Sequence, residues 1–154
     1  AGGNIPDQDV NEKFLHKLNF LEEMSVWFAN RRSARAILVG DLNVAPSAND
    51  VWSHSRLLNV VSHTPIEVAA LKKIMGKGNW VDAVRHFTPE TRKLFSWWSY
   101  RARDWSSSNR GRRLDHIWVT PGLLSALDAA WILRDIRGWP DPSDHVPVLL
   151  DLDV

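Results

Sequence analysis

Apolar residues at helical spacing dominate the first thirty positions of the chain. The residues that define this pattern are Phe14, Leu18, Leu21 and Phe28. Their spacing predicts an amphipathic helix over about 10–30 that packs on a sheet. Asp9 followed by Glu12 has the spacing of a capping box, so we expect Asp9 to cap the start of this helix.

Wholly apolar or alternating runs predict strands in the rest of the chain. Residues 36–39 read Ala-Ile-Leu-Val, which is typical of a central strand covered on both faces. Further strands are predicted over 95–100, 114–120, 129–134 and 146–152. Thr64-Pro65-Ile66-Glu67 starts a second helix over about 65–75, with Thr as the cap and Pro in the first turn. Helices interspersed with strands predict a layered α/β fold.

Composition bounds the class of protein only loosely. The 154 residues are 44% hydrophobic, which is ordinary for one globular core. The chain has no cysteine, which excludes disulfides and thiolate metal sites and fits a reducing compartment. Because no apolar run approaches the ~20 residues of a membrane span, we expect no membrane partner and a cytoplasmic location.

Basic residues are concentrated in one stretch although the net charge is only +1. Against the two acids Glu90 and Asp104, this stretch contains Arg85, Arg92, Lys93, Arg101, Arg103, Arg110, Arg112 and Arg113. Such a cluster predicts a local surface for a polyanion. Surplus arginine on a solvated loop is the alternative.

Candidate chemistry lies at the ends of three predicted strands. The strings are Gly40-Asp41-Leu42-Asn43, Arg113-Leu114-Asp115-His116 and Ser143-Asp144-His145. Strand ends hold reactive side chains rigidly around one cleft. If the backbone stays extended, Asp41 and Asn43 emerge on one face; the alternative is a turn, which both residue types favour.

Hydrolysis of a phosphodiester requires charge neutralisation, an activated water and a stabilised leaving oxygen. Carboxylates suit Mg²⁺, and an imidazole serves either as a cation that binds a phosphoryl oxygen or as a neutral base. The residues that together indicate a metal-dependent phosphodiesterase site are Asp41, Asn43, Asp115, Asp144 and His145.

Four motifs in a fixed order carry a family resemblance: GDLN, FSWWSY, NRGRRLDH and SDHVPV. The chain resembles the exonuclease III family of abasic-site DNA repair nucleases, within the DNase I-like endonuclease/exonuclease/phosphatase group. The resemblance implies an α+β fold that is part of a four-layer α/β sandwich. This chain is expected to supply one mainly antiparallel sheet with its flanking helices. Because the family's domain is longer, we expect residues 1–154 to form its C-terminal half and to need the upstream half.

The resemblance also implies roles for individual residues. Asp41, Asn43, Asp115 and His145 are expected to be catalytic, with Asp115 orienting His145. Asp144 and Asp41 are expected to hold Mg²⁺, with Mn²⁺ as an alternative. Trp97 and Leu114 match positions of an apolar pocket that accepts an extruded sugar lacking its base. The basic stretch adds Arg110, Arg112 and Arg113 as candidates for phosphate contacts that position DNA.

The leading functional hypothesis is therefore a Mg²⁺-dependent DNA repair nuclease. It is expected to cut 5′ to abasic sites and to remove nucleotides or blocking groups from 3′ ends of duplex DNA, as a monomer when complete. One alternative is a phosphodiesterase or phosphatase of the same fold group that acts on RNA, an inositol phosphate or a sphingolipid. Another is a non-catalytic DNA-binding fragment, which binds duplex in a salt-sensitive way without cleavage.

Overall fold

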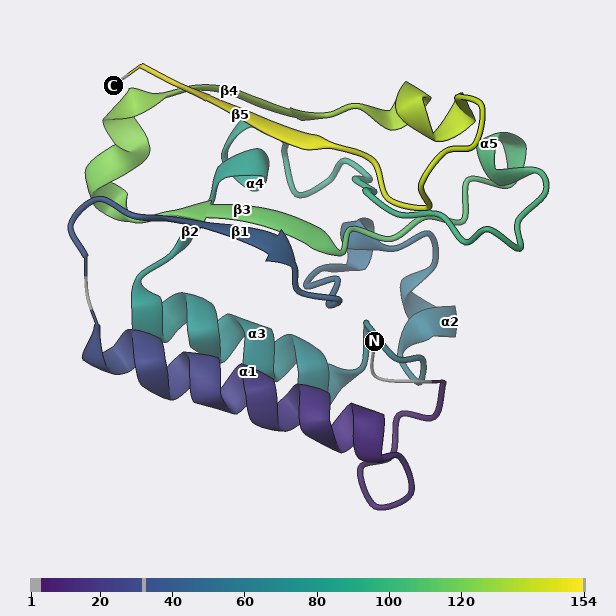
Figure 1. Ribbon diagram of the computed structural model, residues 1–154, viewed down its shortest axis with the longest axis horizontal. Coiled ribbons are helices and arrows are strands. Elements are labelled where there is room, and N and C mark those ends of the chain that lie inside the picture. The colour runs from purple at the N-terminus through teal and green to yellow at the C-terminus, as the bar shows by residue number, and fades with distance from the viewer. Residues whose placement is uncertain (1–3, 32, 154) are drawn as a thin grey trace.

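Helices and strands are arranged in layers in the computed structural model, which describes residues 4–31 and 33–153. Helices α1 (Glu12–Asn30) and α3 (Pro65–Gly78) lie side by side against one face of a three-stranded sheet (Figure 1). A strand pair lies on the other side of that sheet, with α4 (Ala83–Phe87) between the two (Figure 1). The remaining short helices are η1 (Ala48–Asp50), α2 (His54–Leu57), α5 (Trp105–Ser108), η2 (Pro121–Ala126) and η3 (Arg134–Gly138).

The strands form antiparallel ladders throughout. The larger sheet has the order β1-β3-β2, and the smaller one pairs β4 with β5. Their bounds are β1 Ile37–Asp41, β2 Val81–Asp82, β3 Asp115–Val119, β4 Leu127–Ile132 and β5 Val148–Leu152. In the described part of the chain, hydrogen bonding therefore divides the strands between two sheets, whereas the sequence predicted one.

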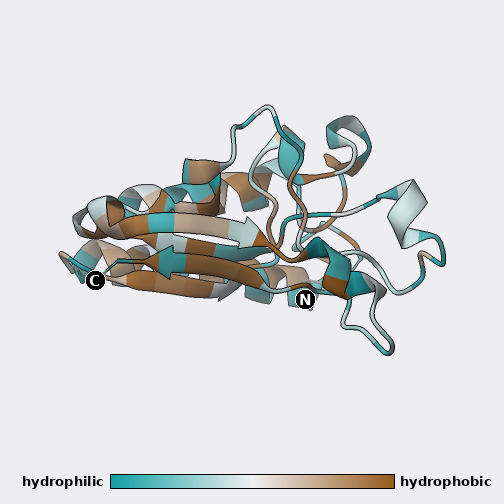
Figure 2. Ribbon diagram, turned by 90° about the horizontal axis from the view of Figure 1, so that it is seen from above, coloured by the Kyte–Doolittle hydropathy of each residue, from teal (hydrophilic) through white to brown (hydrophobic). Residues whose placement is uncertain are grey.

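The two long helices begin where side chains cap them. Asn11, and not Asp9, is the N-cap of α1, and its side chain accepts hydrogen bonds from the amides of Lys13 and Phe14 at 3.1 and 3.2 Å. Thr64 and Glu67 form the predicted capping box of α3. Between helices and sheet lies a core cluster of Leu21, Phe28, Val44, Leu71, Ile74 and Trp118. Figure 2 shows hydrophobic residues running along the strands.

Strand β1 departs from its prediction in two ways: it stands at the edge of its sheet, and one of its two faces is exposed. Leu38 packs against the core under the helices, but the side chains of Ile37 and Val39 are 46% and 66% exposed. The predicted strand over 95–100 is also wrong: only Trp97 forms isolated bridges there, to Arg112 and to His145. Among the described residues, no helix has the length and hydrophobicity needed to cross a lipid bilayer.

Arg113 is a structural residue, and this corrects its predicted contact with phosphate. Its side chain is 1% exposed, and its guanidinium forms a bidentate pair with the Asp50 carboxylate at 2.8 and 3.0 Å. The same guanidinium donates to Asp82 at 2.6 Å. Burial alone raises the pKa of Asp50, but the charges of Arg113 and Arg85 outweigh burial and hold that pKa below its usual value. Arg113 therefore joins η1 to the end of β2 and is enclosed by protein.

Replacing Arg113 tests this structural role. Arg113→Met leaves Asp50 buried without its bidentate partner, so we expect the free energy of unfolding to fall by about 3–5 kcal/mol. Lys73→Met breaks the exposed pair between Lys73 and Glu22, and its cost is expected to stay below about 1 kcal/mol. Urea unfolding followed by circular dichroism measures both. A cost for Arg113→Met as small as that of Lys73→Met would contradict the assignment.

Candidate active site

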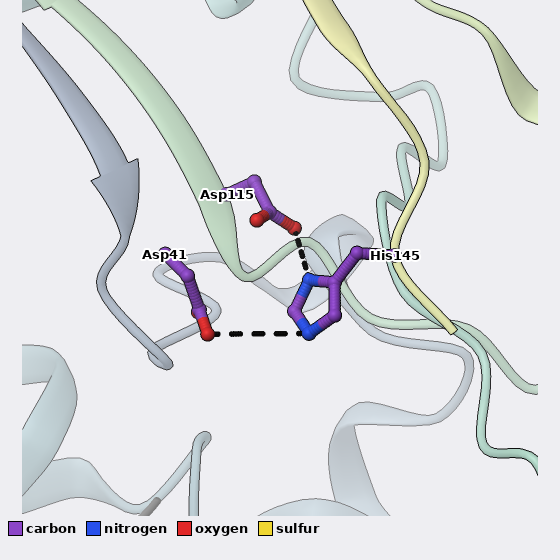
Figure 3. Close-up of side chains that lie close together, drawn as sticks. All are labelled: Asp41, Asp115 and His145. Carbon is purple, nitrogen blue, oxygen red and sulfur yellow. Dashed lines mark hydrogen bonds and ion pairs between the residues drawn. The ribbon is translucent and has the colours of Figure 1, made fainter. Parts of the chain in front are cut away.

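Three side chains from separate segments meet at one end of the larger sheet. Asp41 ends β1, Asp115 begins β3, and the antiparallel register places these two residues directly opposite each other. His145 approaches from the loop that leads into β5, and its two ring nitrogens face the two carboxylates, Nδ1 toward Asp115 and Nε2 toward Asp41 (Figure 3). One ligand atom from each of the three residues lies within 4.8 Å of the others. The structure thus brings together the predicted residues Asp41, Asp115 and His145.

Asn43 reaches Asp41 through a turn, so the extended geometry considered from the sequence is wrong. The backbone of Asn43 is in the left-handed region, with φ of 54°. Its amide donates to Asp41 Oδ1 at 2.8 Å, and its side-chain Nδ2 donates to Asp41 Oδ2 at 2.6 Å. Asparagine tolerates this backbone conformation better than most residues, and the turn orients both oxygens of the Asp41 carboxylate.

Asp115 is held by a hydroxyl group that the sequence analysis did not single out. Ser96 is fully buried, and its Oγ donates to Asp115 Oδ2 at 2.6 Å while accepting from the amides of Leu114 and Asp115. The same Oδ2 faces His145 Nδ1 at 2.8 Å. With Nδ1–H donating to Asp115, His145 directs Nε2 toward Asp41 Oδ2 at 3.9 Å. Ser96 lies within FSWWSY, but nothing in that string shows that the Ser96 hydroxyl donates to a catalytic carboxylate and does not merely pack in the core.

Burial at Asp41 and a hydrogen bond at His145 shift the two pKa values in the same direction, and neighbouring charges add to both shifts. Burial raises the pKa of Asp41, and the neighbouring Asp115 carboxylate adds to the effect. The hydrogen bond to Asp115 raises the pKa of His145, assisted by the charges of Asp115, Asp41 and Asp144. His145 therefore keeps its proton to higher pH than an ordinary histidine, and Asp41 is a better proton acceptor than an ordinary aspartate.

A cavity of about 560 Å³ opens beside these side chains. Its lining combines Asp41, Asn43, Asp144 and His145 with the apolar Trp97 and Leu114. Asp144 accepts a hydrogen bond from the Trp97 indole at 2.9 Å, so this carboxylate lies on the cavity wall next to the three-residue cluster. Trp98, the neighbour of Trp97, is 1% exposed and belongs to the core.

Of the other two predicted phosphate-binding arginines, Arg112 lines the cavity and Arg110 is exposed. Arg112 donates to the Val61 carbonyl and the Ser62 hydroxyl, and places its guanidinium 5.4 Å from the centre of the Trp97 ring. Arg110 is exposed and stacks over Trp52 at 5.0 Å. Arg112 therefore lies on the cavity wall and Arg110 is open to solvent, whereas Arg113 is enclosed by protein.

The donor set of the cluster fits a divalent cation. The facing carboxylates of Asp41 and Asp115 offer the hard oxygen ligands that Mg²⁺ prefers, and Mg²⁺ commonly takes only one or two carboxylates from a protein. The Asp144 carboxylate on the cavity wall adds a further oxygen donor. The predicted metal ligands Asp41 and Asp144 are thus both present at the site.

The sequence profile of the endonuclease/exonuclease/phosphatase family matches residues 16–145. The matched segment includes every residue of the Asp41, Asp115 and His145 cluster. The chain therefore belongs to this family.

Within this family, the chain is similar to DNA nucleases. Exodeoxyribonuclease III of Haemophilus influenzae is 31% identical over 144 residues, which cover 88% of this chain and 53% of that protein. An exodeoxyribonuclease of Bacillus subtilis is 36% identical over 120 residues, covering 77% of this chain and 44% of the relative. A solved AP endonuclease from Archaeoglobus fulgidus superposes with a TM-score of 0.88 at 31% identity, covering 94% of this chain and 56% of that one.

These likenesses confirm two predictions, the resemblance to the exonuclease III family and the DNase I-like α+β fold class. The chain spans about half the length of the relatives that it matches.

Titration of His145 tests the electrostatics of the cluster. In metal-free buffer, we expect the pKa of His145 to lie above its ordinary value of 6.5 and to fall in Asp115→Asn, because the acceptor loses its charge. The stabilisation of the fold by this pair is complete below pH 6.5 and is lost as the pH rises through the raised pKa. Proton–nitrogen NMR of the imidazole measures the shift. Asp128→Asn, on an exposed residue of β4, is the control, and an equal pKa change in both variants would refute the pairing.

Proposed function

We propose that this chain carries the catalytic side of a divalent-metal-dependent DNA repair nuclease of the exonuclease III type. The observation that carries the proposal is the convergence of Asp41, Asp115 and His145, because Asp41 and His145 also line a cavity with Trp97 and Leu114. Similarity to proteins named exodeoxyribonuclease III and AP endonuclease supports the same reaction class. Because those relatives are about twice as long, the proposed activity belongs to a domain of their full length.

The residues divide the work of phosphodiester hydrolysis. Asp41, held by Asn43, orients a water molecule and takes its proton as the water oxygen attacks phosphorus. His145, held as a cation by Asp115, donates from Nε2 to a phosphoryl oxygen whose charge grows in the transition state. The bond from phosphorus to the 3′ oxygen breaks, and that oxygen leaves. A bound Mg²⁺ or Mn²⁺, held by Asp144 together with Asp41, would neutralise the phosphate and stabilise the leaving oxygen.

The preferred substrate is duplex DNA that carries an abasic site or a damaged 3′ end. Trp97 and Leu114 give the cavity an apolar wall that suits a sugar without its base, and an abasic nucleotide leaves the stack at low cost. Arg110 and Arg112 supply contacts to backbone phosphates that position the duplex without reading its sequence. The combination of an apolar wall and flanking arginines favours DNA over an inositol phosphate, which offers no apolar group to this wall.

Incision of a duplex with one abasic site tests the proposal. We expect cleavage 5′ to the site in Mg²⁺ and none in EDTA, with the rate reduced about 10³-fold in His145→Ala because the donor to the phosphoryl oxygen is lost. His86→Ala, which removes an exposed histidine on α4, is the matched control and should cut at the normal rate. Gel analysis of an end-labelled strand measures both rates.

The assay is run on the 154-residue chain and on the longest polypeptide that its gene encodes. Cleavage only by the longer polypeptide places the remaining catalytic groups upstream and supports the proposal. Salt-sensitive duplex binding without Mg²⁺-dependent cleavage by either polypeptide would contradict it and favour a non-catalytic DNA-binding function. A normal rate for His145→Ala would remove His145 from the mechanism.

A further inference from the structure

We propose that Lys17 and Glu67 are positioning residues, a buried ion pair that sets the geometry of the catalytic Asp41–Asn43 turn. The inference rests on the proposed function and extends it to residues outside the cavity's catalytic groups. Both residues lie on the helical layer, one on α1 and one on α3, and neither lines the cavity that contains Asp144 and His145. Their influence on the reaction passes through the backbone that holds Asn43.

Lys17 connects α1 directly to the catalytic turn. The side chain is 7% exposed, and its ammonium donates to the Asn43 carbonyl at 2.7 Å. That carbonyl belongs to a residue in the left-handed conformation, which is sparsely populated for residues other than glycine. Fixing the carbonyl fixes the peptide plane, and the plane determines where the Asn43 amide and side chain point. Both of these groups donate to Asp41.

Glu67 holds Lys17 in place and ties it to Ser62, which also lines the cavity. Its carboxylate is 0% exposed and forms an ion pair with the Lys17 ammonium. The same carboxylate accepts from the Ser62 amide at 2.9 and 3.0 Å and from the Thr64 hydroxyl at 2.6 Å. Ser62 in turn accepts from Arg112, the candidate phosphate contact, at 2.7 Å. One buried carboxylate therefore sets both the catalytic turn and the loop that orients Arg112.

The energetics favour a positioning role over simple stabilisation. A buried ion pair is weak evidence for stability, because apolar replacements of similar volume are often neutral or stabilising. The two helices already pack through Leu21, Leu71 and Ile74. They also share the exposed pair between Lys73 and Glu22, so an ion pair between α1 and α3 exists without any link to the site. The Lys17–Glu67 pair differs from the Lys73–Glu22 pair because the Lys17 ammonium also donates a hydrogen bond to the Asn43 carbonyl.

The double variant Lys17→Met/Glu67→Gln tests the inference. It removes both charges of the pair together, and the glutamine oxygen still accepts from the Ser62 amide. We expect the melting temperature to change little while kcat on an abasic duplex falls about 10²-fold, the scale expected when a catalytic group shifts by about 1 Å. Lys73→Met is the matched control and should leave kcat within about threefold of the unchanged protein.

A structural readout keeps this test independent of the proposed function. The amide and side-chain resonances of Asn43, assigned by proton–nitrogen NMR, should shift or broaden in the double variant and stay unchanged in Lys73→Met. If the unchanged protein cuts no DNA, the proposed function fails and the Asn43 resonances alone decide the positioning role.

A second comparison applies if the double variant is less stable than the unchanged protein. Phe28→Leu weakens the far end of α1 without touching Asn43, and it serves as the stability-matched control. A loss of kcat in the double variant that exceeds the loss in Phe28→Leu supports positioning. An equal loss in both, or unchanged Asn43 resonances, would overturn it.

Discussion

The antiparallel register between β1 and β3 is the constraint on which the candidate site depends. It places Asp41 opposite Asp115, so two carboxylates about 75 positions apart in the sequence face one another at the same end of the sheet. A slip of one residue would turn every side chain of β1 to the other face and separate the pair. The loop before β5 places His145 next to both carboxylates, and the hydrogen bond from His145 to Asp115 completes the cluster. The chemistry of the site is therefore a consequence of strand pairing.

Buried ion pairs join the segments that surround the paired strands β1 and β3. Arg113 joins η1 to β2 through Asp50 and Asp82, and Lys17 with Glu67 joins both long helices to the catalytic turn. Each pair bridges segments that hydrophobic packing alone would locate only roughly, because apolar contacts are not directional. Hydrogen-bonded charges specify orientation as well as distance. Apolar packing thus brings the segments together, and the buried ion pairs fix their orientation. This explains why buried charges occur close to a site that must hold its carboxylates in one geometry.

Local patterns in the sequence predicted the parts of the structure that local physics determines. The capping box at Thr64 and Glu67 was recognisable because its members are three residues apart, and the helical pattern of Phe14, Leu21 and Phe28 identified the buried face of α1. Asp41, Asp115 and His145 were found because each adjoins an apolar run within a motif. Glu67 was recognised only as a cap, and its ion pair with Lys17 spans 50 positions.

Long-range partners could not be read from the sequence. The sequence predicts a DNA contact for Arg113 because arginine in a basic stretch usually faces solvent, but its partner Asp50 lies 63 positions away. Ser96 and Lys17 carry no local signal for the contacts they make. The exposed face of β1 was missed for a related reason: an apolar strand reads as buried whether or not this chain supplies the layer that covers it.

A double-variant cycle on Asp115 and His145 tests the central claim most directly, that these residues act as one catalytic unit in phosphodiester hydrolysis. Single-turnover incision rates of an abasic duplex are measured for Asp115→Asn, His145→Ala and the combination, in the longest polypeptide that the gene encodes. We expect the double variant to be no slower than His145→Ala, because Asp115 acts through the imidazole. Losses that multiply would show that the two residues act separately and would contradict the account.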